Sequence, residues 1–235
     1  RRAILMLEAE EAPAGIMPVI ISSQAGGVLI HEAVGHGLEA DLAEKGVSVY
    51  KGKIGEKVAS NSVTLVDAGV LEEKYGSSYV DDEGVKTYKK YLIEDGILKE
   101  YLHNLYTANK ERRNSTGNGV RLNFKSLPKI ASFNMYIKPG IRTEREIISS
   151  VKNGIYIISL MGLHLADTVS GDFSLGIEGL QIRDGEFYKP LAEMTVAGNL
   201  KDLLNSISEV GSELYFKGNV ASPMIKLEDV MVSGK

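Results

Sequence analysis

The chain has 235 residues, of which 43% are hydrophobic and 25% charged, an ordinary balance for a globular protein. Its 27 lysines and arginines stand against 31 aspartates and glutamates, so the formal net charge is −4, and there is no dense basic run. Direct binding of nucleic acid is therefore not expected. The chain has no cysteine, which excludes disulfides and thiolate metal ligands.

The first 15 residues, RRAILMLEAEEAPAG, combine basic residues with a short apolar run. Acidic residues follow where a signal peptide would have its cleavage site, so we interpret the segment as the end of a helix broken at Pro13 and Gly15. No apolar run approaches the ~18 residues that a membrane-spanning helix requires. We expect a cytoplasmic protein without a membrane partner.

A β-branched run predicts a short buried strand at 18–23. A helix is expected next, over about 27–43, with the serines at 22–23 offering N-cap oxygens. A second strand is predicted at 63–69, followed by an acidic, glycine-containing loop at 70–86.

Residues 89–102 carry a hairpin signal, because two apolar runs flank Glu94-Asp95-Gly96 and Asp-Gly supports the positive φ angles of a tight turn. A short helix that breaks into a loop is expected over 104–119, and a strand over 130–137.

In the helix predicted at 143–154, Thr143 and Glu146 form a capping box and Gly154 is the expected stop. The pattern then turns to β over 155–189, with a hairpin turn at Arg183-Asp184-Gly185. A last amphipathic helix is predicted at 198–211 and a closing strand at 224–232. This order predicts an α+β fold with a largely antiparallel β-sheet and packed helices, in one domain over residues 1–235.

The stretch GGVLIHEAVGHGLEAD holds two of the four histidines of the chain. Glu32 follows His31, and His36 lies five positions after His31, where the common zinc-peptidase motif has four. In a regular α-helix, residues five apart point ~140° away from each other, whereas residues four apart are separated by only ~40°. The pair is either a metal site on a distorted helix or two unrelated core histidines.

A π-type bulge at Val34-Gly35 would bring both imidazoles onto one face of the helix, and such bulges favour functional sites. Gly35 and Gly37 flank His36 and are expected to ease this distortion, at a cost in helix stability of up to about 1 kcal/mol each.

The motif resembles, almost residue for residue, that of the TldD/PmbA family, known as modulators of DNA gyrase and as zinc metallopeptidases. The resemblance extends along essentially the whole chain, through GEKVAS, VDDEG, LIEDGIL, STGNGVR, EIISSVKNGIYI, SGDFSLGIEGLQIRDGE and TVAGNL. It covers the C-terminal metallopeptidase portion of the family, without the N-terminal domain that usually precedes it.

The resemblance implies a zinc-dependent metallopeptidase that cleaves unfolded or small peptides. His31 and His36 would be zinc ligands and Glu32 the general base acting on a zinc-bound water. A homo- or heterodimer with a family member is also implied.

Catalytic zinc normally has three protein ligands, and TldD-type members take the third from a cysteine near the C-terminus. Here that segment, FKGNVASPMIKLEDVMV, has no cysteine and resembles the PmbA (TldE) branch, which generally lacks the His-Glu motif and is inactive. The alternative function is therefore a non-catalytic partner subunit or peptide-binding scaffold with a vestigial metal motif.

As the third zinc ligand in place of the cysteine, we favour His164. The alternative is that His164 is a core histidine or one that orients the ligands without binding the metal. We expect His103 to be an exposed residue at a strand edge. Glu39 is either a carboxylate ligand, a group that orients a histidine, or a helix-surface glutamate, and we favour the last. Ser222 lies near the missing cysteine, but a neutral hydroxyl is a poor zinc ligand.

Two further stretches are weaker candidates. Gly117-Asn118-Gly119 is more typical of a loop than of a phosphate site, since no helix with a lysine follows. The acidic run at 81–83 is interpreted as a solvated turn rather than a calcium loop.

Overall fold

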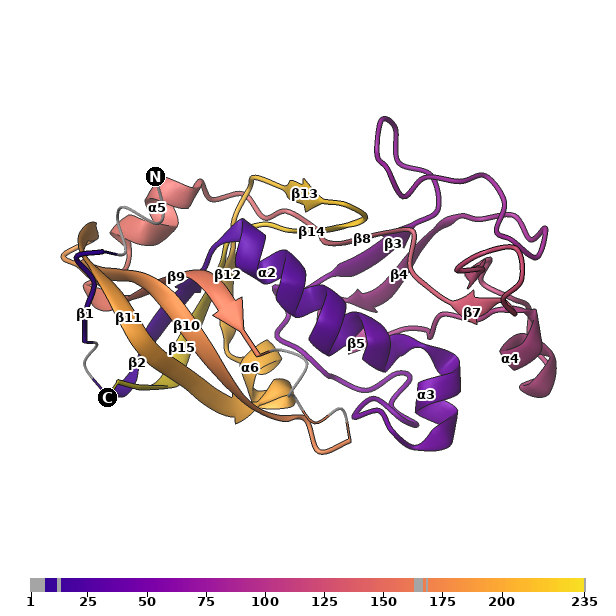
Figure 1. The fold of residues 1–235 in the computed structure, drawn as a ribbon, viewed down its shortest axis with the longest axis horizontal. Helices are drawn as coiled ribbons and strands as arrows, with labels where there is room; N and C mark the ends of the chain where they lie inside the picture. Colours follow the sequence, from indigo (N-terminus) through magenta and orange to yellow (C-terminus); the bar gives the residue numbers. More distant parts are fainter. Residues whose placement is uncertain (1–6, 12–13, 163–166, 168, 235) are drawn as a thin grey trace.

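The computed structural model describes residues 7–11, 14–162, 167 and 169–234. Two large sheets lie on either side of a central helix, with shorter helices around them (Figure 1). The first sheet has seven strands in the order β1-β11-β10-β9-β2-β15-β12. Their bounds are β1 Glu10–Glu11, β2 Gly15–Ile21, β9 Asn153–Met161, β10 Asp172–Arg183, β11 Glu186–Asn199, β12 Ile207–Val210 and β15 Ile225–Ser233.

The second sheet has six strands in the order β13-β14-β8-β3-β4-β5. They are β3 Leu65–Ala68, β4 Lys89–Glu94, β5 Ile97–Leu98, β8 Asn134–Ile137, β13 Tyr215–Lys217 and β14 Val220–Ser222. A separate pair joins β6 Gly119–Val120 to β7 Lys129–Ile130. Among the strands named here, the parallel pairs are β1–β11, β2–β9 and β8–β14. The predicted α+β fold with a largely antiparallel sheet is thus confirmed.

The helices are short. They are α2 Ser23–Leu29, a π-helix Ile30–Gly35, a 3-10 helix His36–Leu38, α3 Ala40–Lys45, α4 Leu105–Lys110, α5 Glu144–Ser149 and α6 Leu200–Asn205. No helix in the described ranges is long and apolar enough to cross a membrane.

Several predicted local signals are present. Thr143 and Glu146 form both hydrogen bonds of the capping box of α5. Asp95 and Gly96 have φ angles of 48° and 81° between β4 and β5, and Asp184 and Gly185 have 51° and 81° between β10 and β11. These turns have the positive φ at both central residues that tight hairpins require.

Three element predictions were wrong in part. Of the N-terminal segment expected to be helical, the described residues 7–11 hold no helix and end in β1. Gly154 does not stop α5, which ends at Ser149; it lies in β9, where a side chain would approach the carbonyl oxygen of Pro18 to 2.5 Å. The helix expected at 198–211 ends at Asn205.

The second half of that segment forms β12, because Ile207–Val210 pairs with β15. Its apolar residues Leu200, Leu203, Leu204 and Ile207 have helical spacing, and all four are buried. A short apolar run satisfies both periods, so pairing with a distant strand decided its conformation.

The segment with the histidine pair lies between the two sheets (Figure 1). Helix α2 packs against β9 of the seven-stranded sheet and against β13 and β14 of the six-stranded sheet. The π-helix that follows packs against β8 and β14. One hydrophobic cluster accordingly includes Leu29 of α2, Ile155 of β9 and Leu65 of β3. The histidines are therefore held by packing from both sides.

Candidate metal centre and adjoining pocket

The histidine-bearing segment begins with a capped helix and then changes its winding. The Ser22 hydroxyl accepts a hydrogen bond from the backbone N–H of Ala25 at 3.3 Å, as predicted for an N-cap. The chain continues as a π-helix over Ile30–Gly35. The bulge expected from the spacing of the two histidines is therefore present, and it includes Val34 and Gly35.

The π-helix brings the two imidazoles together. The ring centroids of His31 and His36 lie 5.0 Å apart, and the ring planes are inclined by 53°. The expectation that both rings lie on one face of the helix is thereby confirmed. Their role as metal ligands stays a prediction. The His36 side chain is 42% exposed, so solvent and ligands reach it.

The glycines next to His36 serve packing rather than unusual backbone angles. Gly35 is right-handed helical, with φ −59° and ψ −50°. A side chain on Gly35 would come within 3.1 Å of the Met135 sulfur, and one on Gly37 within 2.9 Å of the Tyr50 ring. Small residues are needed here because the helix lies against β8 and the buried Tyr50.

Glu39 corrects the prediction of a helix-surface glutamate. Its carboxylate oxygen Oε1 lies 2.7 Å from Nδ1 of His36, and its side chain is only 16% exposed. The helix breaks at this residue, which has the extended angles φ −75° and ψ 124°. The break pairs with Leu102: Ala40 N–H donates to the Leu102 carbonyl and Leu102 N–H to that of Leu38. A distant segment thus turns Glu39 back towards His36.

This contact assigns the nitrogens of His36. An ionised carboxylate only accepts hydrogen bonds, so Nδ1 of His36 carries the proton that it donates to Glu39. In the neutral ring the lone pair is then on Nε2, the nitrogen through which such a histidine binds a metal ion. Histidine ligands in metalloproteins characteristically have such a carboxylate partner, which fixes the ring and raises its basicity. The His31–His36 pair with Glu39 fits part of a zinc site.

The backbone of Glu32 lies in the same π-helix, between the two histidines. His164 lies outside the described residues, so its role as third ligand stays a prediction. The strand before it, β9, packs against α2. Within the described ranges, no group of three or more His, Cys, Asp or Glu residues is placed to hold a metal ion.

Ser222 and His103 are both fully buried. The Ser222 hydroxyl donates to the carbonyl of Pro223 at 2.7 Å and packs beside Gly26, one turn before the histidines. His103 was wrongly expected to be exposed. Its Nδ1 lies 3.2 Å from the Thr107 hydroxyl. Burial lowers the pKa of His103 to about 4, with the positive charge of Arg113 adding to the effect, so the ring is neutral near pH 7.

The acidic run at 81–83 is a turn, as predicted, but only Asp82 of its three residues is exposed. Asp81 is buried, and its carboxylate accepts hydrogen bonds from the backbone N–H groups of Glu83, Val85 and Gly119 at 2.8–2.9 Å. The Glu83 carboxylate accepts from the N–H of Leu105 at 2.7 Å, at the first residue of α4. These carboxylates join loops that are distant in the sequence, which an inspection of neighbouring residues does not show.

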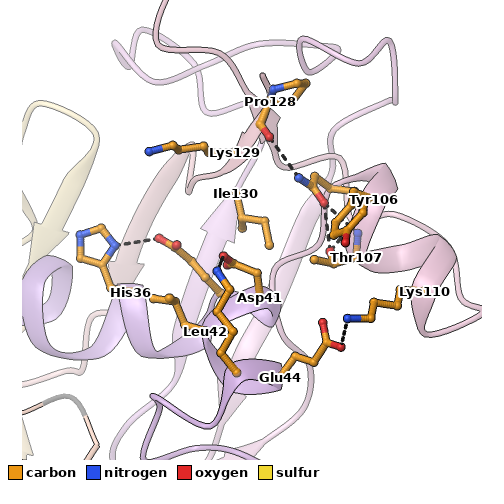
Figure 2. Close-up of a pocket in the computed structure, with 13 residues that line it drawn as sticks. His36, Asp41, Leu42, Glu44, Tyr106, Thr107, Lys110, Pro128, Lys129 and Ile130 are labelled. Carbon is orange, nitrogen blue, oxygen red and sulfur yellow. Dashed lines mark hydrogen bonds and ion pairs between the residues drawn. The ribbon is translucent and has the colours of Figure 1, made fainter. Parts of the chain in front are cut away.

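A pocket of about 820 Å³ opens beside His36 (Figure 2). Three segments form it: His36 to Lys45, Asn104 to Lys110 and Pro128 to Ile130. The side chains of Leu42, Tyr106, Pro128 and Ile130 supply its apolar surface. The sequence does not predict this pocket, because its walls come from segments that meet only through the tertiary fold.

An α+β fold in which a π-helix brings two histidines together, with a carboxylate bonded to one of the rings, is the arrangement of a candidate metal-binding domain. The chain belongs to the PmbA/TldD family: the family model for the PmbA/TldA metallopeptidase C-terminal domain matches residues 14–234. The resemblance inferred from the motifs is thereby confirmed.

Curated relatives are named metalloproteases. A Metalloprotease TldD homolog from Buchnera aphidicola is 37% identical over 249 residues, covering 100% of this chain and 51% of that protein. A protein named Zinc metalloprotease TldD homolog from Saccharolobus solfataricus is 30% identical over 215 residues, covering 91% and 48%. The chain thus spans about half the length of the curated relatives it matches.

Solved structures agree with the fold. A putative modulator of DNA gyrase from Thermotoga maritima has a TM-score of 0.91 at 31% identity, over 98% of this chain and 53% of that one. TldE from Thermococcus kodakarensis has a TM-score of 0.88 at 29% identity, over 95% and 51%. The fold is therefore shared by members named for different roles.

Proposed function

We propose that this chain is the catalytic part of a zinc-dependent peptidase, with His31 and His36 as zinc ligands and His164 as the third. The observation that carries the proposal is that the π-helix brings the rings of His31 and His36 together, with 5.0 Å between their centroids, and that Glu39 is bonded to His36. The name of the Saccharolobus relative, a zinc metalloprotease, supports the choice of metal.

In this proposal the residues divide the chemistry between them. Bound zinc would polarise the peptide carbonyl and lower the pKa of a water molecule towards 7. Glu32 accepts the proton of the attacking water and passes it to the leaving amine. Glu39 holds the His36 ring in the tautomer that leaves Nε2 unprotonated.

The proposed substrates are unfolded or small peptides, which pair with an edge strand through main-chain hydrogen bonds. Strand β7 lines the pocket and, in the described part of the chain, pairs with β6 alone. We further propose one domain, since a single hydrophobic cluster takes residues from both sheets. A dimer with itself or a family member and a cytoplasmic location stay predictions.

The test uses the natural full-length protein, purified without added zinc. We expect near-stoichiometric zinc that His164→Ala removes, because catalytic zinc needs three protein ligands. His31→Ala and Glu32→Gln should abolish cleavage of an unstructured peptide while the far-ultraviolet circular dichroism stays unchanged. Cleavage that survives both substitutions would show the assignment to be wrong.

The alternative is a non-catalytic partner subunit with a vestigial histidine pair. The missing cysteine and the likeness to a TldE structure favour it. Protein without zinc and without peptidase activity, even after zinc is supplied, would support this reading and contradict the first.

A further inference from the structure

The pocket beside His36 contains several charged groups, and most of them compensate one another. Glu39 accepts a hydrogen bond from the neutral His36 ring and so keeps its own negative charge. Asp41 pairs with Lys45 at 2.9 Å, and Glu44 pairs with Lys110 (Figure 2). A ligand entering the pocket therefore meets little net charge from α3 and α4.

Lys129 differs from Lys45 and Lys110, the other two lysines that line the pocket. Among the described residues, none forms a hydrogen bond or ion pair with its ammonium group. Its side chain extends from β7 towards the His36 end of the pocket (Figure 2). It lies beside Ile130, which is only 6% exposed. Lys129 itself is exposed, so the pocket has, among the described residues, one solvent-accessible lysine without an ion-pair partner.

We propose that Lys129 makes this pocket a subsite for a carboxylate group of the peptide substrate. An ammonium group without an ion-pair partner favours an anionic ligand, with which it forms a charge-assisted hydrogen bond. The leucine, isoleucine, proline and tyrosine side chains contact the apolar part of the same peptide residue. A volume of about 820 Å³ has room for such a residue.

Two sources supply such a carboxylate: the C-terminus of the peptide, or an Asp or Glu side chain within it. Both present the same chemistry to Lys129. The inference rests on the proposed peptidase function for the identity of the ligand, but the binding preference is measurable without catalysis.

The experiment measures binding in the full-length protein carrying Glu32→Gln, so that peptides are not cleaved. Three fluorescent, unstructured peptides of equal length are compared by anisotropy: one with a free C-terminus, one amidated, and one amidated with an internal glutamate. We expect one or both carboxylate peptides to bind roughly 5- to 20-fold more tightly than the amidated peptide. Which of them does so identifies the source.

Lys129→Met should abolish this preference, and Lys129→Arg should retain most of it. Lys125→Met is the matched control: Lys125 is exposed in the loop that precedes β7, stands over the Phe124 ring at 5.3 Å and does not line the pocket. The control should leave the preference unchanged. Equal binding of the three peptides, or a preference that survives Lys129→Met, would overturn the inference.

Cleavage by the protein with native Glu32 separates this inference from the proposed function. Cleavage without a carboxylate preference rejects the inference alone. A Lys129-dependent preference without any cleavage in the presence of zinc rejects the peptidase function and leaves the carboxylate subsite standing.

Discussion

Glu39 shows how one side chain sets the chemistry of its neighbour. Its carboxylate accepts a hydrogen bond from Nδ1 of His36 at 2.7 Å, so in the neutral ring the lone pair is on Nε2. The spacing of the two residues is visible in the sequence. The contact itself depends on the helix break at Glu39, where the backbone pairs with Leu102.

We expect Glu39→Gln to weaken zinc binding about 10- to 100-fold, the usual effect of losing a carboxylate behind a histidine ligand. The neutral amide still offers a hydrogen-bond acceptor but no negative charge, so the imidazole becomes a weaker ligand. Competition with a chelator of known affinity measures the change. Glu44→Gln, in the same pocket but paired with Lys110, should leave zinc affinity as it is. An unchanged affinity in Glu39→Gln would show that this contact does not support metal binding.

Helix α2 is positioned by close contact with strand β14. A side chain on Gly26 would lie 2.7 Å from the Ser222 hydroxyl oxygen and 2.9 Å from the Ser222 Cβ. The next residue, Gly27, is different: its nearest neighbours would be 3.9 Å away, which is ordinary van der Waals contact. Both glycines are buried in the same short helix. Alanine substitutions at the two positions therefore gain similar helix propensity but differ in packing.

We expect Gly27→Ala to raise the free energy of unfolding by up to about 1 kcal/mol, because alanine favours the helix. Gly26→Ala should lower it by about 1–3 kcal/mol, since overpacking exceeds the gain in propensity. Urea denaturation of the two variants measures both effects. Ser222→Gly in the Gly26→Ala background should recover part of the loss. Equal effects of the two alanines would contradict the close approach of α2 and β14.

The fold as a whole is tied together by a buried polar network in the six-stranded sheet. Lys90 of β4 and Asp67 of β3 form an ion pair at 3.2 Å with both side chains fully buried. Asn118 bridges them, accepting from Lys90 at 3.0 Å and donating to Asp67 at 2.9 Å. Asp67 also accepts from the N–H of Phe133 at 2.8 Å. Segments up to 66 residues apart thus share one cluster.

Lys90→Met should lower the free energy of unfolding by about 3–5 kcal/mol, because it leaves the Asp67 carboxylate buried without its cation. Lys89→Met is the control. Lys89 precedes Lys90 on the same strand but is exposed, over the Tyr91 ring at 5.4 Å, so its loss should change stability by less than about 1 kcal/mol. Chemical denaturation of both variants gives the comparison. A small effect of Lys90→Met would mean that the network contributes little to stability.

Features encoded by neighbouring residues were predictable. The capping box of α5, the N-cap Ser22 and the turns at Asp95 and Asp184 follow from backbone preferences that act over two to four residues. The π-helix between the histidines also followed from the sequence, because a five-residue spacing places both rings on one face only with that winding.

Features that depend on distant segments were not predictable. The strand β12 exists because β15 pairs with it, although its residues continue a helical apolar pattern. His103 is buried, and Asp81 binds backbone groups of Gly119, through contacts that no local pattern encodes. The pocket with Lys129 joins α3, α4 and β7. Backbone winding is a local property of the chain, whereas burial, charge compensation and the walls of a pocket arise only when remote segments pack together.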